Sequence, residues 1–305
     1  MLTSVETQCL AAFRAGAGVP VVADPHDAWI AFGLYGLLEA SHMLRAALAA
    51  DARGAVVEKH DGSPATAVEH QVELRLRERL AAFQPQATMV GEETGGDLPA
   101  TGWTIAVDPV DGTWAFLTGT ETYSSTLAVF RDGVPLFGFV ANPTTGTIAY
   151  GAAAGASRLL RVALVGEADA ACDLPEATNP GDKVLVNLHP SVDGAWAFAA
   201  LHAAWKARQV RSVRSPGGSP AWAIVEAARG RYVYANVWST KPAEPFDLAA
   251  AAVILRGAGG DVVGLDGQAV DVRSHAGPFV AGLRQAARQP VVELLRDARG
   301  LIPPP

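Results

Sequence analysis

Two carboxylates three residues apart are the strongest chemical signal in this chain of 305 residues. Asp108 and Asp111 belong to the segment Asp-Pro-Val-Asp-Gly-Thr at 108–113, which follows the apolar run 103–107. Two like charges on one turn repel each other unless a cation lies between them. Mg²⁺ is the simplest such cation, because it prefers carboxylate and carbonyl oxygens. An ordinary Asp-Gly turn between two strands is the alternative interpretation.

Three further acidic sites accompany this segment. Glu92 is followed by Glu93 in a polar stretch, Asp247 opens an apolar helix, and Glu69 lies at the start of another helix. Each site has a structural explanation of its own. Adjacent acids commonly lie in solvated loops, and an acid in the first turn of a helix is favoured by the helix dipole. The four sites together are harder to explain in this way.

The elements that must position these acids follow from the spacing of the apolar residues. Helical periodicity predicts helices over 27–50 and 68–83, joined by a turn-rich loop at 59–66. The strands expected in the first half of the chain cover 103–107, 124–130, 134–141 and 147–150, with a hairpin turn at 131–133.

A soft boundary is expected near residue 160, and strands alternate with helices beyond it. Such alternation is typical of α/β layering. The strands expected there cover 183–187, 211–214, 232–237 and 261–265, and the helices cover 195–209, 220–229 and 246–257.

Composition and charge exclude several kinds of partner. Half of the residues are hydrophobic, which suffices for one large domain or two packed subdomains. The net charge of −7 argues against a nucleic-acid polymer or an anionic membrane surface as a partner. An anionic substrate would need local positive charge, which bound metal ions could supply.

The cysteines and the apolar runs indicate a soluble, cytoplasmic protein. Cys9 and Cys172 lie far apart without metal-ligand spacing, as free thiols do in a reducing cytosol. The segment 1–18 carries charges and lacks a continuous apolar core, so we expect no signal peptide. The apolar run 28–38 is too short to span a bilayer.

In their order along the chain, the acidic motifs resemble the inositol monophosphatase superfamily of metal-dependent, lithium-sensitive phosphatases. The motifs are Gly91-Glu92-Glu93, the hexapeptide 108–113, and Asp247 followed by Ala249-Ala250 and Gly259-Gly260. Upstream, Lys59 and the segment 61–66 resemble the loop and helix start that precede those motifs. The resemblance covers roughly residues 30–270 and implies an α/β (α+β) fold, the layered αβαβα sandwich of the inositol monophosphatase and fructose-1,6-bisphosphatase type.

The resemblance also implies a role for each site residue. Gly112 and Thr113 would offer backbone N–H groups to the phosphate, and Ser219 would line the substrate pocket. Glu69, Thr113 and Asp111 are the expected catalytic residues. Thr113, hydrogen-bonded to an acid of the helix near Glu69, would orient the attacking water. The ligands implied for two to three Mg²⁺ ions are Glu92, Asp108, Asp111 and Asp247, with the backbone carbonyl of Val110.

On this resemblance, the chain divides into two parts with different tasks. An N-terminal α+β subdomain, 1–160, would carry most of the metal ligands. A C-terminal α/β subdomain, 161–305, would carry the last ligand and the loops of the substrate pocket. We expect a homodimer, as is general in the family.

The sequence departs from the family pattern at three places. Glu69 stands where the family usually has Asp, and the extra methylene would shift the carboxylate by about 1 Å, a displacement that can cost on the order of 100-fold in rate. Phe246 replaces a usual Trp, which keeps the aromatic character. The segment 236–245 is longer than its counterpart in the family, where it helps to form the substrate pocket.

We therefore expect a Mg²⁺-dependent phosphomonoesterase that hydrolyses a small soluble ester, similar to inositol monophosphate, by an activated water. The alternative activities are those of a 3′(2′),5′-bisphosphate nucleotidase or a fructose-1,6-bisphosphatase, and histidinol phosphate is a further candidate substrate. The nucleotidase branch often carries Gly-Ser-Ser-x-Lys, whereas this chain has Gly-Ser-Pro-Ala-Trp at 218–222. In a different class, the chain would be a catalytically weak regulatory protein that binds metal and phosphate.

Overall fold

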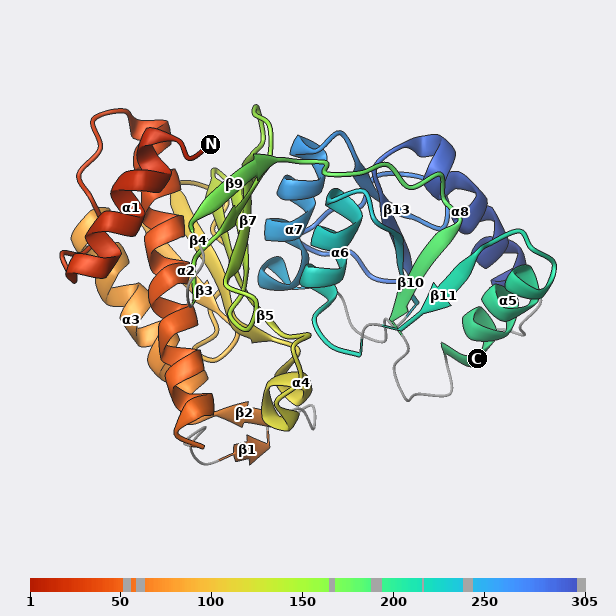
Figure 1. The fold of residues 1–305 in the computed structure, drawn as a ribbon, viewed down its shortest axis with the longest axis horizontal. Helices are drawn as coiled ribbons and strands as arrows, with labels where there is room; N and C mark the ends of the chain where they lie inside the picture. Colours follow the sequence, from red (N-terminus) through yellow and green to blue (C-terminus); the bar gives the residue numbers. More distant parts are fainter. Residues whose placement is uncertain are drawn as a thin grey trace.

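The computed structural model describes residues 1–51, 56–58, 64–164, 168–187, 194–215, 217–237 and 244–300, without the side chains of 56–58 and Asp247. Lys59 and residues 61–63 of the predicted loop lie outside this range. Within it, helices and strands are stacked in the order α–β–α–β–α (Figure 1). The expected layered α/β fold is confirmed.

The first sheet has seven strands and is covered on one face by three N-terminal helices (Figure 1). Its strands run in the order β3-β4-β5-β6-β7-β8-β9, with β3 parallel to β4 and every other pair antiparallel. The strands are β3 (Thr88–Gly91), β4 (Trp103–Asp111), β5 (Ser124–Arg131), β6 (Val134–Asn142), β7 (Thr147–Ala152), β8 (Arg158–Arg161) and β9 (Ala170–Asp173). The helices are α1 (Ser4–Ala15), α2 (Pro25–Ala49) and α3 (Ala67–Phe83).

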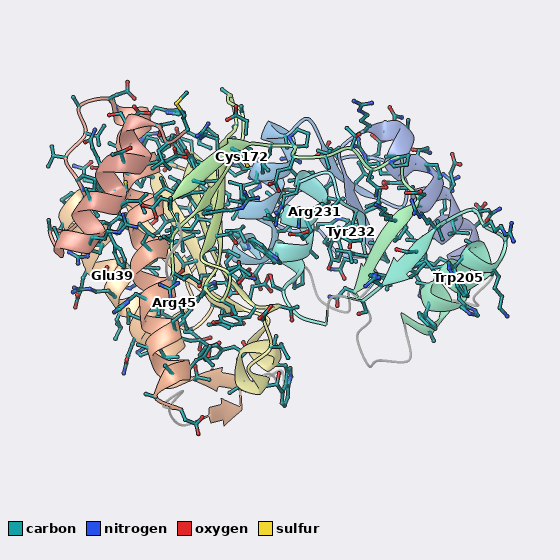
Figure 2. The ribbon with its side chains drawn as sticks, in the orientation of Figure 1. Glu39, Arg45, Cys172, Trp205, Arg231 and Tyr232 are labelled. Atoms are coloured by element: carbon teal, nitrogen blue, oxygen red, sulfur yellow. The ribbon has the colours of Figure 1, made fainter. Side chains whose placement is uncertain are left out.

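Helix α3 is held against α2 by ion pairs on its outer side. Glu39 of α2 accepts hydrogen bonds from Arg75 Nε at 2.9 Å and from Arg79 Nε at 3.0 Å. Figure 2 shows Glu39 on α2, on the side facing away from the second sheet. The charged outer side of α3 thereby fixes the helix, while its apolar side packs into the core with Val68, Val72 and Leu76.

The second sheet has five strands in the order β11-β10-β12-β14-β13. Strands β11, β10 and β12 are parallel, whereas β14 is antiparallel to both of its neighbours. The strands are β10 (Lys183–Asn187), β11 (Ser212–Arg214), β12 (Val233–Asn236), β13 (Asp261–Gly264) and β14 (Phe279–Gly282). Its outer face is covered by α5 (Ala195–Lys206) and α8 (Gln285–Gly300) (Figure 1).

Helices α6 (Pro220–Ala228) and α7 (Pro245–Gly257) lie between the two sheets (Figure 1). The small side chains of α7 let both sheets approach, and Ala249–Ala252 are at most 1% exposed. At Gly138 of β6, an added Cβ would overlap the carbonyl group of Ala250. This close approach leaves no space for a larger side chain at that point between the first sheet and α7.

Three short elements complete the described chain at the edge where the site lies. Strands β1 (Val56–Glu58) and β2 (Pro64–Thr66) form an antiparallel pair beside helix α4 (Thr113–Thr118) (Figure 1). Across the described ranges, no helix is both long and apolar enough to cross a membrane.

Residue 160, where we expected a boundary, lies within β8. The first sheet continues to Asp173, and the second begins at Lys183. The strands of the first sheet beyond β7 are short and carry polar residues, so their apolar pattern was too weak to predict them.

Candidate active site

The two central carboxylates lie at the carboxyl end of β4, on an edge of the first sheet. Asp108 is 4% exposed and Asp111 is 9% exposed. The pairing with β5 shifts between them, so Asp108 lies opposite Thr126 and Asp111 lies opposite Ser124. Asp108 Oδ1 accepts a hydrogen bond from Val110 N at 2.8 Å. The end of β4 is therefore an irregular turn in which the Asp108 side chain accepts the N–H group two residues later, as in an Asx turn.

Glu92 reaches the same edge because β3 and β4 are parallel. Gly91, the last residue of β3, pairs with Val107, the residue before Asp108. Glu92 N then donates to Val107 O at 3.1 Å. The predicted ligands Glu92 and Asp108 thus follow directly after two paired positions of neighbouring strands.

Gly112 turns the chain from β4 into helix α4. Its φ angle is +90°, in the left-handed region that favours glycine. An added Cβ would lie 2.8 Å from Ser219 N. Both the backbone angle and the close approach of the loop before α6 require glycine here.

The Thr113 hydroxyl lies between two acceptors at the start of α4. Thr113 Oγ1 is 3.0 Å from Glu69 Oε1 and 3.2 Å from Val110 O. The predicted contact between Thr113 and an acid of α3 is therefore present, and that acid is Glu69 itself.

Glu69 is fully buried, at 0% exposure. One carboxylate oxygen accepts from Thr66 N and the other from Thr113 Oγ1, so the side chain joins the start of α3 to the start of α4. Burial raises the pKa of Glu69 to about 7 and the nearby charge of Glu93 adds to this, while the bonds from Thr66 and Thr113 oppose it.

Asp111 is bound to the first turn of α6, across the gap between the two sheets. Asp111 Oδ2 accepts from Ala221 N at 2.8 Å and from the hydroxyl of Ser219. Ser219 is the N-cap of α6, with Trp222 N donating to its hydroxyl at 2.8 Å, and it also contacts Ser124 Oγ at 2.7 Å. These contacts show Ser219 as a helix cap and a partner of Asp111, and its direct contact with substrate stays a prediction.

Asp247 lies in the first turn of α7, and its side chain is outside the described residues. The backbone before it is fixed beside the site. Thr126 Oγ1 donates to Phe246 O at 2.8 Å, and Thr126 is the residue of β5 that lies opposite Asp108. The start of α7 is thereby attached to the strand next to Asp108.

The described oxygens suit a hard divalent cation. The carboxylates of Asp108 and Asp111 and the carbonyl of Val110 come from a single turn, and Mg²⁺ takes such donors. Among the described residues, the carboxylates of Glu92, Asp108 and Asp111 do not form a group with all ligand atoms within 4.8 Å. The carboxylates of Asp24 and Asp27 and the imidazole of His26 do form such a group. The metal ligand set at β4 is supported by donor chemistry and stays a prediction.

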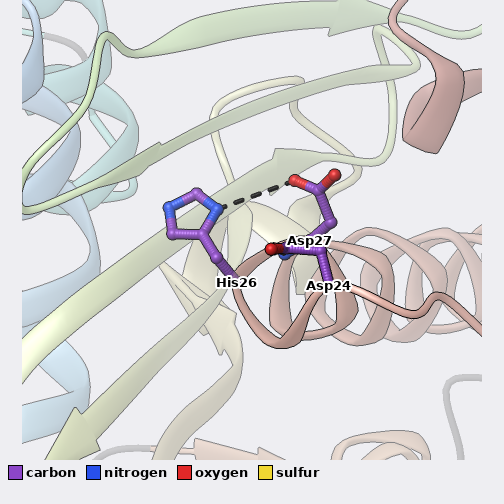
Figure 3. Close-up of side chains that lie close together, drawn as sticks. All are labelled: Asp24, His26 and Asp27. Carbon is purple, nitrogen blue, oxygen red and sulfur yellow. Dashed lines mark hydrogen bonds and ion pairs between the residues drawn. The ribbon is translucent and has the colours of Figure 1, made fainter.

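The group of Asp24, His26 and Asp27 lies at the start of α2 (Figure 3). Asp24 Oδ1 accepts from Asp27 N at 2.9 Å, which makes Asp24 the N-cap of the helix. His26 Nδ1 is 3.6 Å from Asp27 Oδ1. The side chains of Asp24 and His26 are exposed, and helix capping accounts for the position of Asp24.

One acid beside the site was missed by sequence reasoning. Glu73 is fully buried and accepts from Glu93 N at 2.7 Å and from Thr94 N at 3.1 Å. The signal that could have identified it is its position four residues after Glu69, on the side of α3 that also carries Val72 and Leu76.

Comparison with protein families gives one match over most of the chain. The sequence model described as the inositol monophosphatase family matches residues 30–298. Among solved structures, an IMPase from Thermotoga maritima superimposes with a TM-score of 0.69 at 18% identity, covering 87% of this chain and 95% of that one. At that identity the superposition shows a shared fold.

Curated relatives align over shorter segments. The histidinol-phosphatase of Mycobacterium tuberculosis is 39% identical over 85 residues, which are 28% of this chain and 33% of the relative. The inositol-1-monophosphatase of Mycobacterium leprae is 40% identical over 90 residues, 28% of this chain and 31% of the relative. The aligned segments thus span about a third of the length of these relatives.

Proposed function

We infer that this chain, which belongs to the inositol monophosphatase family, hydrolyses a small phosphomonoester with the help of Mg²⁺. One observation carries the proposal. The Thr113 hydroxyl lies 3.0 Å from the buried Glu69 carboxylate, directly after the two carboxylates at the end of β4. A hydroxyl bound to a buried acid, beside hard oxygen donors, is an arrangement that can orient water toward a phosphate.

Each residue of the site has a task in this reaction. The Mg²⁺ ions would be held by Glu92, Asp108, Asp111, Asp247 and the carbonyl of Val110. When bound, they would polarise the phosphoryl oxygens and favour ionisation of water. The backbone N–H groups of Gly112 and Thr113 would bind the phosphate.

Glu69 and Thr113 would accept the proton of the attacking water. The Thr113 hydroxyl donates to Glu69 Oε1, so its oxygen can accept a hydrogen bond from the attacking water. The pKa of Glu69, raised to about 7 by burial, suits a group that takes up a proton near neutral pH. Glu69 Oε1 would receive the proton through Thr113 Oγ1.

The substrate is proposed as an inositol monophosphate or an ester of similar size. Histidinol phosphate is the second candidate, because a histidinol-phosphatase is among the relatives with the highest local identity, at 39%. The second sheet contributes Asn187 and Asn236, paired at the carboxyl ends of β10 and β12. Strand ends of this kind are where ligands bind in open α/β sheets, so substrate choice is proposed to depend on them.

Phosphate release from a small panel tests the proposal. The panel contains inositol 1-phosphate, histidinol phosphate, fructose 1,6-bisphosphate and 3′-phosphoadenosine 5′-phosphate, each with and without MgCl₂. Asp108→Asn should lower Mg²⁺-dependent release at least about 100-fold, because it removes a charged ligand while keeping the side-chain shape. Retained activity would contradict the proposal.

Asp132→Asn provides the matched control for Asp108→Asn. Asp132 lies in the exposed turn between β5 and β6 with a φ angle of +52°, which Asn also tolerates. Its activity should equal that of the wild type. Mg²⁺ binding without turnover of any ester would favour the regulatory-protein alternative.

Three further properties are proposed with it: lithium sensitivity and a homodimer, which the family resemblance implies, and a cytoplasmic location, which the cysteines and apolar runs indicate. Millimolar lithium should inhibit the reaction, and indifference to lithium would weaken this part of the proposal. The homodimer is tested by light scattering during size-exclusion chromatography. The cytoplasmic location is tested by fractionating the cells that produce the protein.

A further inference from the structure

Helix α3 presents two buried carboxylates to the site on successive turns. Glu69 bonds the start of α4 through Thr113, as described above. Glu73, four residues later, bonds the turn that follows β3. It accepts from Glu93 N at 2.7 Å, from Thr94 N at 3.1 Å and from Thr94 Oγ1 at 2.6 Å. One helix therefore contacts two of the segments that carry predicted site residues, the start of α4 and the turn after β3.

The bonds of Glu73 complete the turn from Gly91 to Gly95. Gly91 N donates to Gly95 O at 3.3 Å, and Gly95 N donates to Gly91 O at 2.8 Å. Glu92 N donates to Val107 O of the neighbouring strand at 3.1 Å. With the two amides bound by Glu73, all five backbone N–H groups from Gly91 to Gly95 have an acceptor.

Gly91 makes room for the Glu73 carboxylate. A Cβ at Gly91 would overlap both carboxylate oxygens of Glu73. Glu73 has no exposed surface, and a buried carboxylate is costly unless hydrogen bonds satisfy it. The hydrogen-bond donors to this carboxylate are backbone and hydroxyl groups of the turn that carries Glu92, so that turn supplies the bonds that offset the cost of burying it.

We propose that Glu73 is a positioning residue that holds Glu92 at the edge of the sheet next to Asp108, ready to bind Mg²⁺. Glu73 fixes the backbone on one side of Glu92, and Val107 of β4 fixes it on the other. Residues that hold a metal ligand in place raise the affinity for the metal by keeping the ligand in its bound geometry. This inference rests on the proposed metal site of the phosphatase.

Glu73→Gln is the direct test, because the amide keeps the shape but presents an N–H₂ group to the N–H groups of the turn. Hydrogen exchange of the backbone N–H groups of Glu93 and Thr94 with solvent should become about tenfold faster, as expected for the loss of one hydrogen bond to a charged group. Titration of the purified, metal-free protein with MgCl₂ should show a dissociation constant raised about 10–100-fold. Glu78→Gln, an exposed acid on the same helix that pairs with Arg75, is the matched control and should change neither quantity.

Thr94→Val is the second variant, should Glu73→Gln not fold. It removes an exposed residue's hydroxyl, which donates to Glu73 Oε2 and accepts from Arg77 Nη2 at 2.8 Å, so the protein should fold and bind MgCl₂ less tightly by a few fold. Thr94→Ser keeps the hydroxyl and should restore wild-type binding.

Two results would overturn the inference. The first is a folded Glu73→Gln or Thr94→Val protein with the amide hydrogen exchange and Mg²⁺ affinity of the wild type. The second is a wild-type protein that binds no Mg²⁺. Failure of the proposed function looks different. In that case the wild type binds Mg²⁺ without releasing phosphate, while the variants still bind it more weakly.

Discussion

At the scale of single residues, Glu69 shows how a longer acid can occupy a position where a shorter one is usual. Its carboxylate bonds Thr66 N and Thr113 Oγ1 at the same time. We expected the extra methylene to shift the carboxylate by about 1 Å. In the structure the longer acid lies within hydrogen-bond distance of Thr113, so the side chain joins α3 to α4.

Glu69→Asp should therefore slow the enzyme. The shorter side chain cannot reach both partners, and a shift of about 1 Å at such a site costs on the order of 100-fold in turnover. The measurement is the turnover number for the best ester of the panel at saturating MgCl₂. A faster Glu69→Asp enzyme would show that the longer acid is a handicap.

The acids that sequence reasoning identified share one property, which is a position next to glycine, proline or a helix start. Asp108 and Asp111 stand out beside Pro109 and Gly112 for this reason. Glu73 has no such neighbour, and a helical pattern treats a charged residue as solvent-facing. Its position on the apolar side of α3 could have indicated burial, but its hydrogen bonds to the turn after β3 join segments that no local sequence pattern connects.

At the scale of elements, α1 is attached to the first sheet by a buried ion pair. Glu6 of α1 has no exposed surface and accepts from Tyr150 Oη of β7 at 2.8 Å and from Arg158 Nε of β8 at 3.0 Å. Burial alone would raise the pKa of Glu6, but the bonds from Arg158, Thr3 N and Tyr150 outweigh it and hold that pKa below its usual value.

The stability of the protein should accordingly depend on pH through Glu6. A carboxylate whose pKa is lower in the folded state stabilises the fold above its unfolded pKa of about 4.3, and the stabilisation disappears as the pH falls through the folded value. Glu6→Gln should lower the free energy of unfolding by about 1.5–3 kcal/mol at pH 7. At pH 3 the difference from the wild type should be smaller.

Urea unfolding of both proteins at the two pH values measures this. Glu78→Gln, which changes an acid with 67% of its side chain exposed, is the control and should change the free energy of unfolding little. An equal loss for Glu6→Gln at both pH values would contradict the assignment.

Elements with strong apolar patterns were predictable, and those without were not. Strand β10 has the predicted bounds, Lys183–Asn187, because an apolar core stands between polar ends. Helix α1 was not predicted, although Thr3 and Glu6 form a capping box at its start. Helix α8 also escaped prediction, and it contains Pro290, a residue that usually marks a helix end.

At the scale of the whole molecule, the spacing between the first sheet and α7 depends on small residues. Gly138 of β6 faces the backbone of Ala250, with no room for a Cβ. Because α7 also packs against the second sheet, any change in this spacing displaces both halves of the molecule.

Gly138→Ala should destabilise the fold by about 1–3 kcal/mol, the range for adding a methyl group to a tightly packed core. The measurement is urea unfolding at pH 7. Gly155→Ala is the matched control, because its Cβ would lie 3.8 Å from the nearest side chain in an exposed turn. A Gly138→Ala protein as stable as this control would show that the layers can separate without cost.

The bond between Asp111 and the first turn of α6 has a consequence for genetic dissection of the site. Asp111 lies on the first sheet, yet its Oδ2 caps a helix that packs against the second. An Asp111 variant would therefore lose two things at once, the proposed cation ligand and the contact between the two halves. The described bond of Asp108, from Val110 N at 2.8 Å, lies within its own turn and does not reach α6. Comparing the stability of Asp111→Asn with that of Asp108→Asn therefore measures how much the contact between Asp111 and α6 contributes.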